Sequence, residues 1–270
     1  MKSVLRSIAP EAHVIDITHD IPAHDVRAGA LCLARSAQYL CAGVVLAVVD
    51  PGVGTSRKAV AIEVGGGQSI LVGPDNGLLA PAVSMVGGAT RAVVLNDDRW
   101  HLPAPGPTFA GRDVFAPCVA HLCNGVDIGE LGEDIDPSLL LPGILPITNL
   151  EGDELTCEAL WVDRYGNVQL NVDPEELADW GDRIRVTFHD AAGVRTGRTA
   201  VRAHSYGDLQ RHELGLVVDS YGLVSVAIPR GSAAASLGLT EGTEVRLVRL
   251  DGDEQEMGTG ITTPVELKRK

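Results

Sequence analysis

The sequence predicts an α/β N-terminal domain with a central, mostly parallel sheet, followed by a small all-β C-terminal barrel. In the first half, apolar strands alternate with amphipathic helices, which is typical of an α/β domain. A proline-containing stretch over residues 139–149 ends this pattern, and short apolar runs separated by Gly, Asp, Asn or Pro follow, as in small barrels and sandwiches. We therefore expect an α/β domain over residues 1–145, a barrel over 150–250 and a polar tail over 251–270.

Each expected element follows from local periodicity and from the residues that end it. In the first domain, amphipathic patterns predict helices at 28–40 and 113–123, the second ended by Gly125. Apolar runs in this domain predict strands at 14–15, 44–49, 59–64, 69–72 and 92–95. In the second domain, apolar runs predict strands at 155–162, 168–172, 183–189, 199–203, 215–218, 224–228 and 244–250, and residues 261–267 could add an edge strand.

Composition and charge exclude several classes of partner. The chain has 270 residues and a formal net charge of −14, whereas nucleic acids and anionic membranes bind basic surfaces, so we expect neither as a partner. The longest strongly apolar run, residues 40–49, is too short to span a bilayer, and the first residues lack the apolar segment of a signal peptide. The five cysteines include no Cys-x-x-Cys pair, which favours free thiols in a reducing cytoplasm, with Cys118 and Cys123 in the core.

The most informative candidate for a ligand site is the loop that follows the predicted strand 44–49. It runs from Asp50 through Pro-Gly-Val-Gly-Thr-Ser to Arg57, and it combines a carboxylate, a turn and a cation. In open α/β sheets, ligands bind beyond the carboxyl ends of the strands, where Asp50 would lie. The same residues are also typical of a plain turn with Arg57 in solvent, so the segment alone leaves both interpretations open.

Other polar segments of the first domain have two interpretations each. The side chains of Asp16-Ile-Thr-His-Asp20 could bind substrate or could hydrogen-bond their own loop. Asp75 or Asn76 is expected to cap a helix. Arg112 and Asp113 could pair with each other or with a ligand.

In the second domain, the segment 163–167 carries polar and aromatic side chains that could contact a ligand. Asp163 could accept a ligand ammonium, Tyr165 could stack on a base, and Asn167 offers the paired donor and acceptor that an adenine edge needs. A plain hairpin turn explains the same residues. Ser220, in a later loop, could contact a carboxylate or simply form a turn. The sequence contains no glycine-rich phosphate loop and no metal-spaced histidine cluster, so no cofactor or metal is expected.

Taken together and in order, these segments resemble the SAM hydroxide adenosyltransferase family, which is similar in turn to the fluorinases and chlorinases. The matching segments extend from residue 1 to about residue 250 and lie at 16–22, 49–54, 73–78, 107–113, 163–167 and 230–232. The resemblance implies hydrolysis of S-adenosyl-L-methionine to adenosine and L-methionine, through attack of water or hydroxide on the ribose C5′. It also implies a homotrimer that binds the substrate between neighbouring subunits.

The resemblance assigns roles residue by residue. Asp50 and Arg57 match two members of an Asp-Arg-His set that handles the water: Asp50 orients or deprotonates it, and Arg57 keeps Asp50 ionised. The halogenases lack an aspartate at this position, so Asp50 favours hydrolysis. The other matches are to substrate-binding residues: Asp163 for the methionine ammonium, Ser220 for the carboxylate, Tyr165 and Asn167 for the adenine, and His24 where the halogenases carry a tryptophan.

Two departures from the family pattern keep other functions open. Ala110 stands where the family has the histidine of the water set, and the first strand with its aspartate-bearing ribose loop is absent before Met1, which favours a start assigned too late. These departures motivate a second hypothesis, a non-catalytic protein that binds S-adenosylmethionine or adenosine. A halide-using adenosyl transferase is a third hypothesis, against which Asp50 and Arg57 argue.

Overall fold

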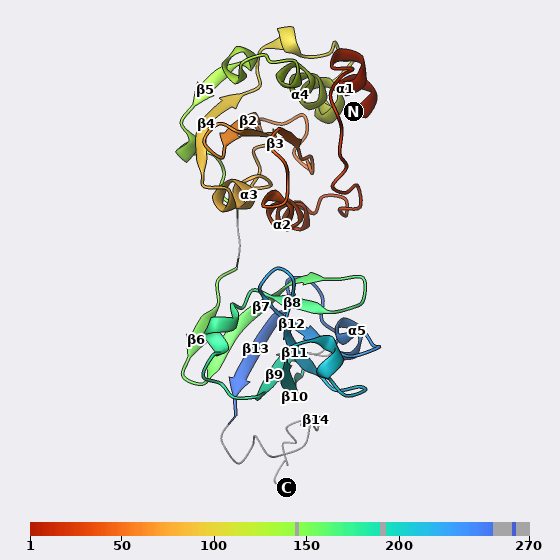
Figure 1. Ribbon diagram of the computed structural model, residues 1–270, viewed down its shortest axis with the longest axis vertical. Helices are drawn as coiled ribbons and strands as arrows, with labels where there is room; N and C mark the ends of the chain where they lie inside the picture. Colours follow the sequence, from red (N-terminus) through yellow and green to blue (C-terminus); the bar gives the residue numbers. More distant parts are fainter. Residues whose placement is uncertain (144–145, 190–192, 251–260, 263–270) are drawn as a thin grey trace. The chain divides into compact units, whose positions relative to one another are not determined.

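The computed structural model describes residues 1–143, 146–189 and 193–250, and the backbone of 261–262. The chain divides into two units, Met1–Ile144 and Leu145–Lys270 (Figure 1). The first unit holds a sheet flanked by helices, and the second holds a β-barrel. The fold class therefore agrees with the sequence prediction, except for the direction of strands in the first sheet.

The sheet of the first unit is mixed. Its strands are β1 (Val44–Leu46), β2 (Ala59–Val64), β3 (Ser69–Pro74), β4 (Ala89–Val94) and β5 (Glu133–Ile135), in the order β1-β3-β2-β4-β5. Among the described strands of this sheet, β1 and β3 pair in parallel and the other neighbours pair antiparallel, so the expected parallel character is confirmed only in part. The reason is the turn at Gly65, Gly66 and Gly67, all at positive φ, which joins β2 directly to β3 as a hairpin. A parallel pair needs a crossover of about a dozen residues.

Helices cover both faces of this sheet. α1 (Lys2–Ile8) and α4 (Ala116–Cys123) pack on one face, and α2 (Val26–Ala37) and α3 (Ala80–Met85) pack on the other (Figure 1). The side chains of β2 alternate between the two layers, because successive residues of a strand point to opposite faces. Ala61 packs with α1 and α4, whereas Val60 and Ile62 pack with α2 and α3. Burial on both faces explains the continuous apolar runs of these strands.

Several predicted elements of the first unit differ in the structure. The helix expected at 113–123 begins earlier, with a π-helical turn at Gly111–Phe115 that leads into α4. The strand expected at 14–15 is wrong: Val14 and Ile15 lie in irregular chain, 47% and 64% exposed, because so short an apolar pair buries too little surface to hold a strand. Cys118 is buried as predicted, but Cys123 is exposed. Three 3-10 turns occur at Asp98–Trp100, Ile128–Leu131 and Pro137–Leu139.

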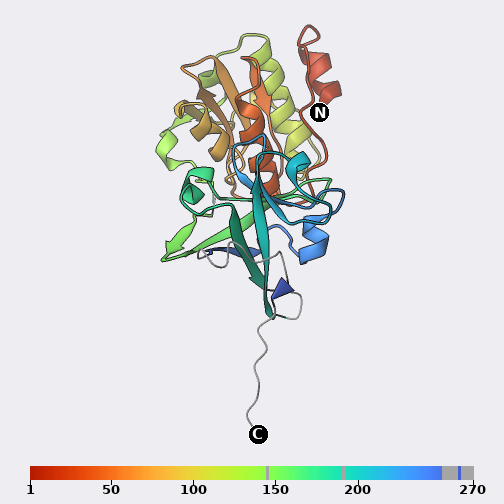
Figure 2. The same cartoon turned by 60° about the horizontal axis from the view of Figure 1, so that its bottom comes forward.

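Seven strands in the described part of the second unit close into a barrel. They are β7 (Glu154–Val162), β8 (Val168–Leu170), β9 (Arg183–His189), β10 (Arg195–Ala203), β11 (Gly215–Val218), β12 (Val224–Ala227) and β13 (Glu244–Arg249). A parallel pairing of β10 with β11 closes the ring, and the other neighbours are antiparallel. Figure 2 shows the long β9–β10 hairpin from a second side. Alternate residues of β9, Ile184, Val186 and Phe188, are buried in the barrel core.

Smaller elements surround the barrel. β6 (Asn149–Glu151) pairs with β7, and β14 (Ile261–Thr262) pairs with β10 as the expected edge strand; the rest of that predicted strand lies outside the described residues. The remaining elements are α5 (Ala233–Leu237) and 3-10 turns at Pro174–Leu177 and Tyr206–Asp208. In the part of the chain that the structure describes, every helix is too short or too polar to cross a membrane.

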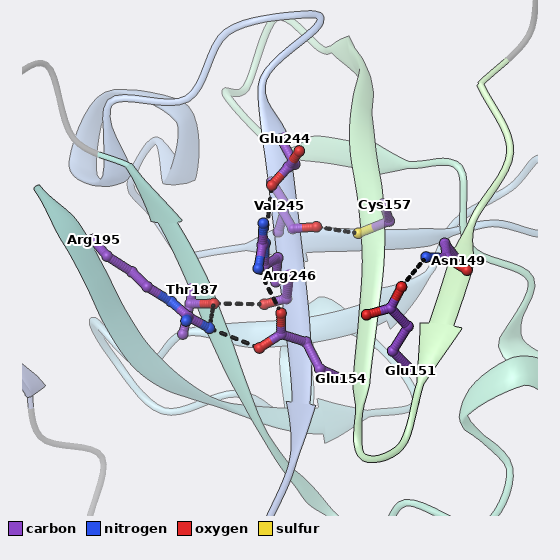
Figure 3. Close-up of polar contacts among 9 residues, drawn as sticks. All are labelled: Asn149, Glu151, Glu154, Cys157, Thr187, Arg195, Glu244, Val245 and Arg246. Atoms are coloured by element: carbon purple, nitrogen blue, oxygen red, sulfur yellow. Dashed lines mark hydrogen bonds and ion pairs between the residues drawn. The ribbon is translucent and has the colours of Figure 1, made fainter. Parts of the chain in front are cut away.

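A network of charged side chains ties four barrel strands together (Figure 3). Glu154 of β7 accepts hydrogen bonds from Arg195 of β10 at 2.7 Å and from Arg246 of β13 at 2.8 Å. Arg195 also reaches the hydroxyl of Thr187 on β9, and Arg246 pairs with Glu244. Burial alone would raise the pKa of Glu154, but the two arginine hydrogen bonds outweigh burial and lower it. The network therefore stabilises the barrel through charge pairs that depend on an ionised Glu154.

Candidate functional site

Asp50 and Arg57 form a buried, two-pronged ion pair in the first unit. Arg57 Nε donates to Asp50 Oδ1 at 3.0 Å, and Arg57 Nη2 donates to Asp50 Oδ2 at 2.5 Å. The side chains are only 11% and 6% exposed, so the alternative of a solvent-exposed Arg57 is wrong. A third hydrogen bond, from Nη1 to the Lys58 carbonyl, and the ring of Phe115 at 5.5 Å hold the guanidinium in place. This fork orients both carboxylate oxygens of Asp50.

The loop between these two residues folds on itself, and this brings position 57 back to position 50. The Val53 N–H donates to the Asp50 carbonyl, and the Thr55 hydroxyl donates to the Gly52 carbonyl at 2.6 Å. Gly54 adopts a φ of 78°, and a side chain there would lie 3.4 Å from the Pro107 carbonyl oxygen. A glycine therefore suits this position on two counts, backbone conformation and close approach.

The loop after β3 supports the same region, but not by capping a helix as expected. α3 begins at Ala80, and Leu79 precedes it without a side-chain cap. The Asn76 amide instead donates to the carbonyl of Val49 at 2.9 Å, and its oxygen accepts the Leu78 N–H at 3.2 Å. Asp75 is buried and accepts the Leu141 N–H. Both side chains are used instead to satisfy backbone groups of nearby segments, and α3 begins too far along the chain for them to cap it.

The segment that carries Ala110 lies beside the Asp50 loop. Pro107 approaches Gly54, and Phe115 packs against Arg57, so residues 107–115 run along this loop. Ala110 itself precedes the π-helical turn and offers no polar group. Arg112 pairs with Asp113 through two hydrogen bonds, of 2.5 and 2.9 Å, which is the first of the two interpretations left open for them.

The polar residues near the N-terminus make local contacts. Asp16 accepts hydrogen bonds from Lys2 at 2.5 Å and from His19 at 3.1 Å, and the Lys2 hydrogen bond is the main reason why the pKa of Asp16 is lowered. Thr18 accepts the Asp20 N–H, as in a loop that hydrogen-bonds to itself. His24 is exposed at a φ of 69°, and no hydrogen bond among the described residues joins its side chain to the Asp50 pair.

In the second unit, Asp163 organises the hairpin turn between β7 and β8. Its carboxylate accepts the N–H groups of Tyr165 at 2.8 Å and Asn167 at 2.9 Å, and the Asn167 side-chain amide at 2.8 Å. The ring of Tyr165 is 73% exposed. The hairpin interpretation is therefore right for the backbone. It does not exclude binding, because a carboxylate offers about four acceptor sites and the Tyr165 ring is open.

A second turn, between β11 and β12, repeats this construction. Asp219 accepts the N–H groups of Tyr221 at 2.8 Å and Leu223 at 3.3 Å, and it also accepts the amide of buried Gln169. Ser220 is exposed on this turn. The pattern Asp-x-Tyr-Gly occurs in both turns, and this repeat was the signal that the sequence prediction missed.

Burial raises the pKa of the Tyr206 phenol, and the nearby charges of Asp219 and Asp163 raise it further. The second turn is joined to the strand that follows the first turn, because Gln169 of β8 donates a hydrogen bond to Asp219. Sequence reasoning did not single out Tyr206, which sits in an unremarked 3-10 turn.

The predicted site residues thus form two groups. Asp50 and Arg57 come together in the first unit, and Asp163, Tyr165, Asn167 and Ser220 lie on two related turns of the second. Within the described residues, no three His, Cys, Asp or Glu side chains are arranged to hold a metal ion.

Comparison with known proteins gives a consistent family. The model of the SAM hydroxide adenosyltransferase N-terminal domain matches residues 1–132, and that of the C-terminal domain matches residues 157–246. A protein of Salinispora tropica named (R)-S-adenosyl-L-methionine hydrolase is 43% identical over 90% of this chain and 89% of its own. A protein of the same name from Thermus thermophilus is 39% identical over 92% of each chain.

More distant comparisons agree. A fluorinase of Actinopolyspora mzabensis is 25% identical over 92% of this chain and 91% of its own. A crystal structure of an uncharacterized conserved protein from Thermotoga maritima superimposes with a TM-score of 0.81 and 31% identity, covering 92% of this chain and 93% of that one. With both domain models matched in order and relatives above 30% identity over most of its length, the chain belongs to the SAM hydroxide adenosyltransferase family.

Proposed function

We propose that this protein hydrolyses S-adenosyl-L-methionine to adenosine and L-methionine. The observation that carries the proposal is the buried, bidentate Asp50–Arg57 pair at the end of the β1 segment. The names of the relatives at 39% and 43% identity support the same substrate and specify the R configuration at the sulfonium.

The reaction replaces one bond at the ribose C5′ by another. A water oxygen attacks C5′, the C5′–S bond breaks, and its electron pair returns to sulfur, which leaves as the neutral thioether of methionine. The attacking water loses one proton to solvent. Because the sulfonium charge disappears as the leaving group departs, the protein needs to position and desolvate the water rather than to stabilise a new charge.

Asp50 is the residue that would aim this water. Arg57 uses one acceptor site on each Asp50 oxygen, and a carboxylate has about four, so one site on each oxygen is left for water. The fork prevents the carboxylate from rotating, which fixes the direction of those sites. Ala110 requires that the pair work without an imidazole at that position.

The substrate contacts are part of the same proposal. Asp163 would take the methionine ammonium, Ser220 the methionine carboxylate, and Tyr165 and Asn167 the adenine; His24 would lie beside the ligand. The exposed Tyr165 ring and the remaining acceptor capacity of Asp163 support these roles.

The assembly and setting of the protein complete the proposal. The family resemblance supports a homotrimer whose substrate sites lie between neighbouring subunits. It also supports a reaction without a cofactor. The net charge of −14 supports the absence of a nucleic-acid partner. Free cysteines support a cytoplasmic location.

The test is incubation with S-adenosylmethionine in heavy-oxygen water without halide, followed by mass spectrometry, for each sulfonium epimer separately. We expect adenosine that carries the heavy oxygen, and its loss in Asp50→Ala. Asp97→Ala is a matched control, because it removes an aspartate from an exposed arginine pair of the same unit. Bound substrate without adenosine would favour the non-catalytic binding protein, and adenosyl halide formed only with added halide would favour a transferase.

A further inference from the structure

The pairing of β1 with β3 fixes which groups should hold the chain just before Asp50. The Ile70 N–H donates to the Gly43 carbonyl at 3.0 Å, and the register pairs Leu46 with Val72. A parallel ladder repeats every two residues along each strand. Continuing this register therefore pairs the N–H of position 74 with the carbonyl of Ala47, and the N–H of position 76 with the carbonyl of Val49.

Neither backbone bond forms in the structure. Position 74 is proline, which has no N–H. At position 76 the chain has turned, and the Asn76 N–H points to the Pro74 carbonyl at 3.1 Å. Two further contacts show that the chains still run close together. The Ala47 N–H donates to the Val72 carbonyl, and a side chain at Gly73 would lie only 2.3 Å from the Ala47 oxygen.

The side chain of Asn76 supplies the missing donor. Its amide Nδ2 donates to the Val49 carbonyl at 2.9 Å, which is the carbonyl that the ladder assigns to position 76. Its oxygen accepts the Leu78 N–H, so both ends of the amide are fixed. Asn76 thus extends the sheet by one hydrogen bond, up to the residue that precedes Asp50.

We infer that Asn76 is a positioning residue for the reaction. Its hydrogen bond to the Val49 carbonyl fixes the distance between the Asp50 carboxylate and the attacking water. The inference rests on the proposed function. Arg57 fixes the direction of the Asp50 carboxylate, and Asn76 fixes the backbone from which Asp50 projects. Misplacement of a reacting group by about 1 Å can cost ~100-fold in rate, so loss of this bond should lower kcat.

Asn76→Asp tests the inference with a change of one atom. The carboxylate keeps the oxygen that accepts the Leu78 N–H but loses the donor to the Val49 carbonyl. We expect kcat for adenosine formation to fall by ~10- to 100-fold, with KM for S-adenosylmethionine within about twofold. Asp75→Asn is the matched control at the neighbouring buried position, since its oxygen can still accept the Leu141 N–H.

The pH profile gives a readout that loss of stability would not produce. A protonated aspartate at position 76 regains an O–H donor, and burial against a carbonyl favours that neutral form. We therefore expect the ratio of variant to wild-type kcat to rise as pH falls. If Asn76→Asp does not fold, Asn76→Ser takes its place: it keeps an acceptor for Leu78 but is too short to reach the Val49 carbonyl, and the same fall in kcat is expected.

The outcomes separate this inference from the proposed function. No adenosine from the wild-type protein would contradict the function itself. Adenosine from the wild type, together with a kcat for the folded variant within twofold of it, would overturn the role of Asn76. A rise in KM with kcat unchanged would also overturn it, because it would place Asn76 in substrate binding rather than in positioning Asp50.

Discussion

Removing the cation from the Asp50–Arg57 pair tests how much free energy of unfolding is lost when the buried Asp50 has no partner. Arg57→Met keeps a long apolar stem but deletes two hydrogen bonds to Asp50 and one to the Lys58 carbonyl. The Asp50 side chain is 6% exposed, so its charge would stay buried without a partner. Breaking a buried pair from one side costs about 3–5 kcal/mol, and we expect the unfolding free energy to fall by that amount.

The double variant Asp50→Asn/Arg57→Met separates the charge from the packing. Replacing both partners of a buried pair is often nearly neutral, because no unpaired charge remains. We therefore expect it to regain at least about half of the stability lost by Arg57→Met. Both variants should form no adenosine. The double variant should therefore recover stability without recovering activity.

Urea unfolding followed by circular dichroism measures these differences. The control is Arg99→Met, which breaks an arginine pair of the same unit whose arginine is 77% exposed, and which should lower stability far less than Arg57→Met does. The reasoning is refuted if Arg57→Met unfolds at the wild-type urea concentration, or if the double variant is as unstable as Arg57→Met.

Three further predictions concern the rest of the molecule. Gly166→Ala should destabilise the protein by more than about 1 kcal/mol, measured by urea unfolding, because Gly166 has a φ of 80° and a side chain there would meet Ser232. The pKa of Glu154 is lowered in the folded state, so its stabilising effect should be complete above the ordinary carboxyl pKa and should vanish as pH falls through the lowered one; Glu154→Gln should remove that pH dependence of the thermal midpoint. Burial raises the pKa of the Cys157 thiol, so iodoacetamide should label exposed Cys41 in the native protein and Cys157 only after unfolding.

The barrel was predictable because each of its strands has a local sequence pattern. Alternate residues of β9 enter the core, and Gly, Asp, Asn or Pro residues lie between the apolar runs, so both the pattern and its breaks are local. The direction of the strands in the first sheet was a different problem. Alternating strands and helices suggested parallel pairing, yet the glycine turn at 65–67 is a hairpin signal between two of those strands. Here the local turn chemistry decided the topology.

At the candidate site, the sequence indicated which residues are candidates, but it did not indicate all of the contacts that they make. The spacing of Asp50 and Arg57 put both on one loop, and the structure brings them together. Asn76 was expected to cap a helix, which is the common role of an asparagine after a strand. Its contact with Val49 depends on the register of two strands far apart in sequence, and on the turn that takes the Asn76 N–H to the Pro74 carbonyl, so no local pattern could predict it.

The two Asp-x-Tyr-Gly turns of the barrel show how fold and function share one motif. Asp163 and Asp219 each accept two backbone N–H groups of their own turn, so both aspartates are required by the fold alone. The two turns differ in the other side chains that they present. Asn167 stands where the second turn has Leu223, and Ser220 stands where the first has an arginine. The first turn therefore adds a side-chain amide, and the second adds a small hydroxyl, to the groups available for the proposed substrate contacts.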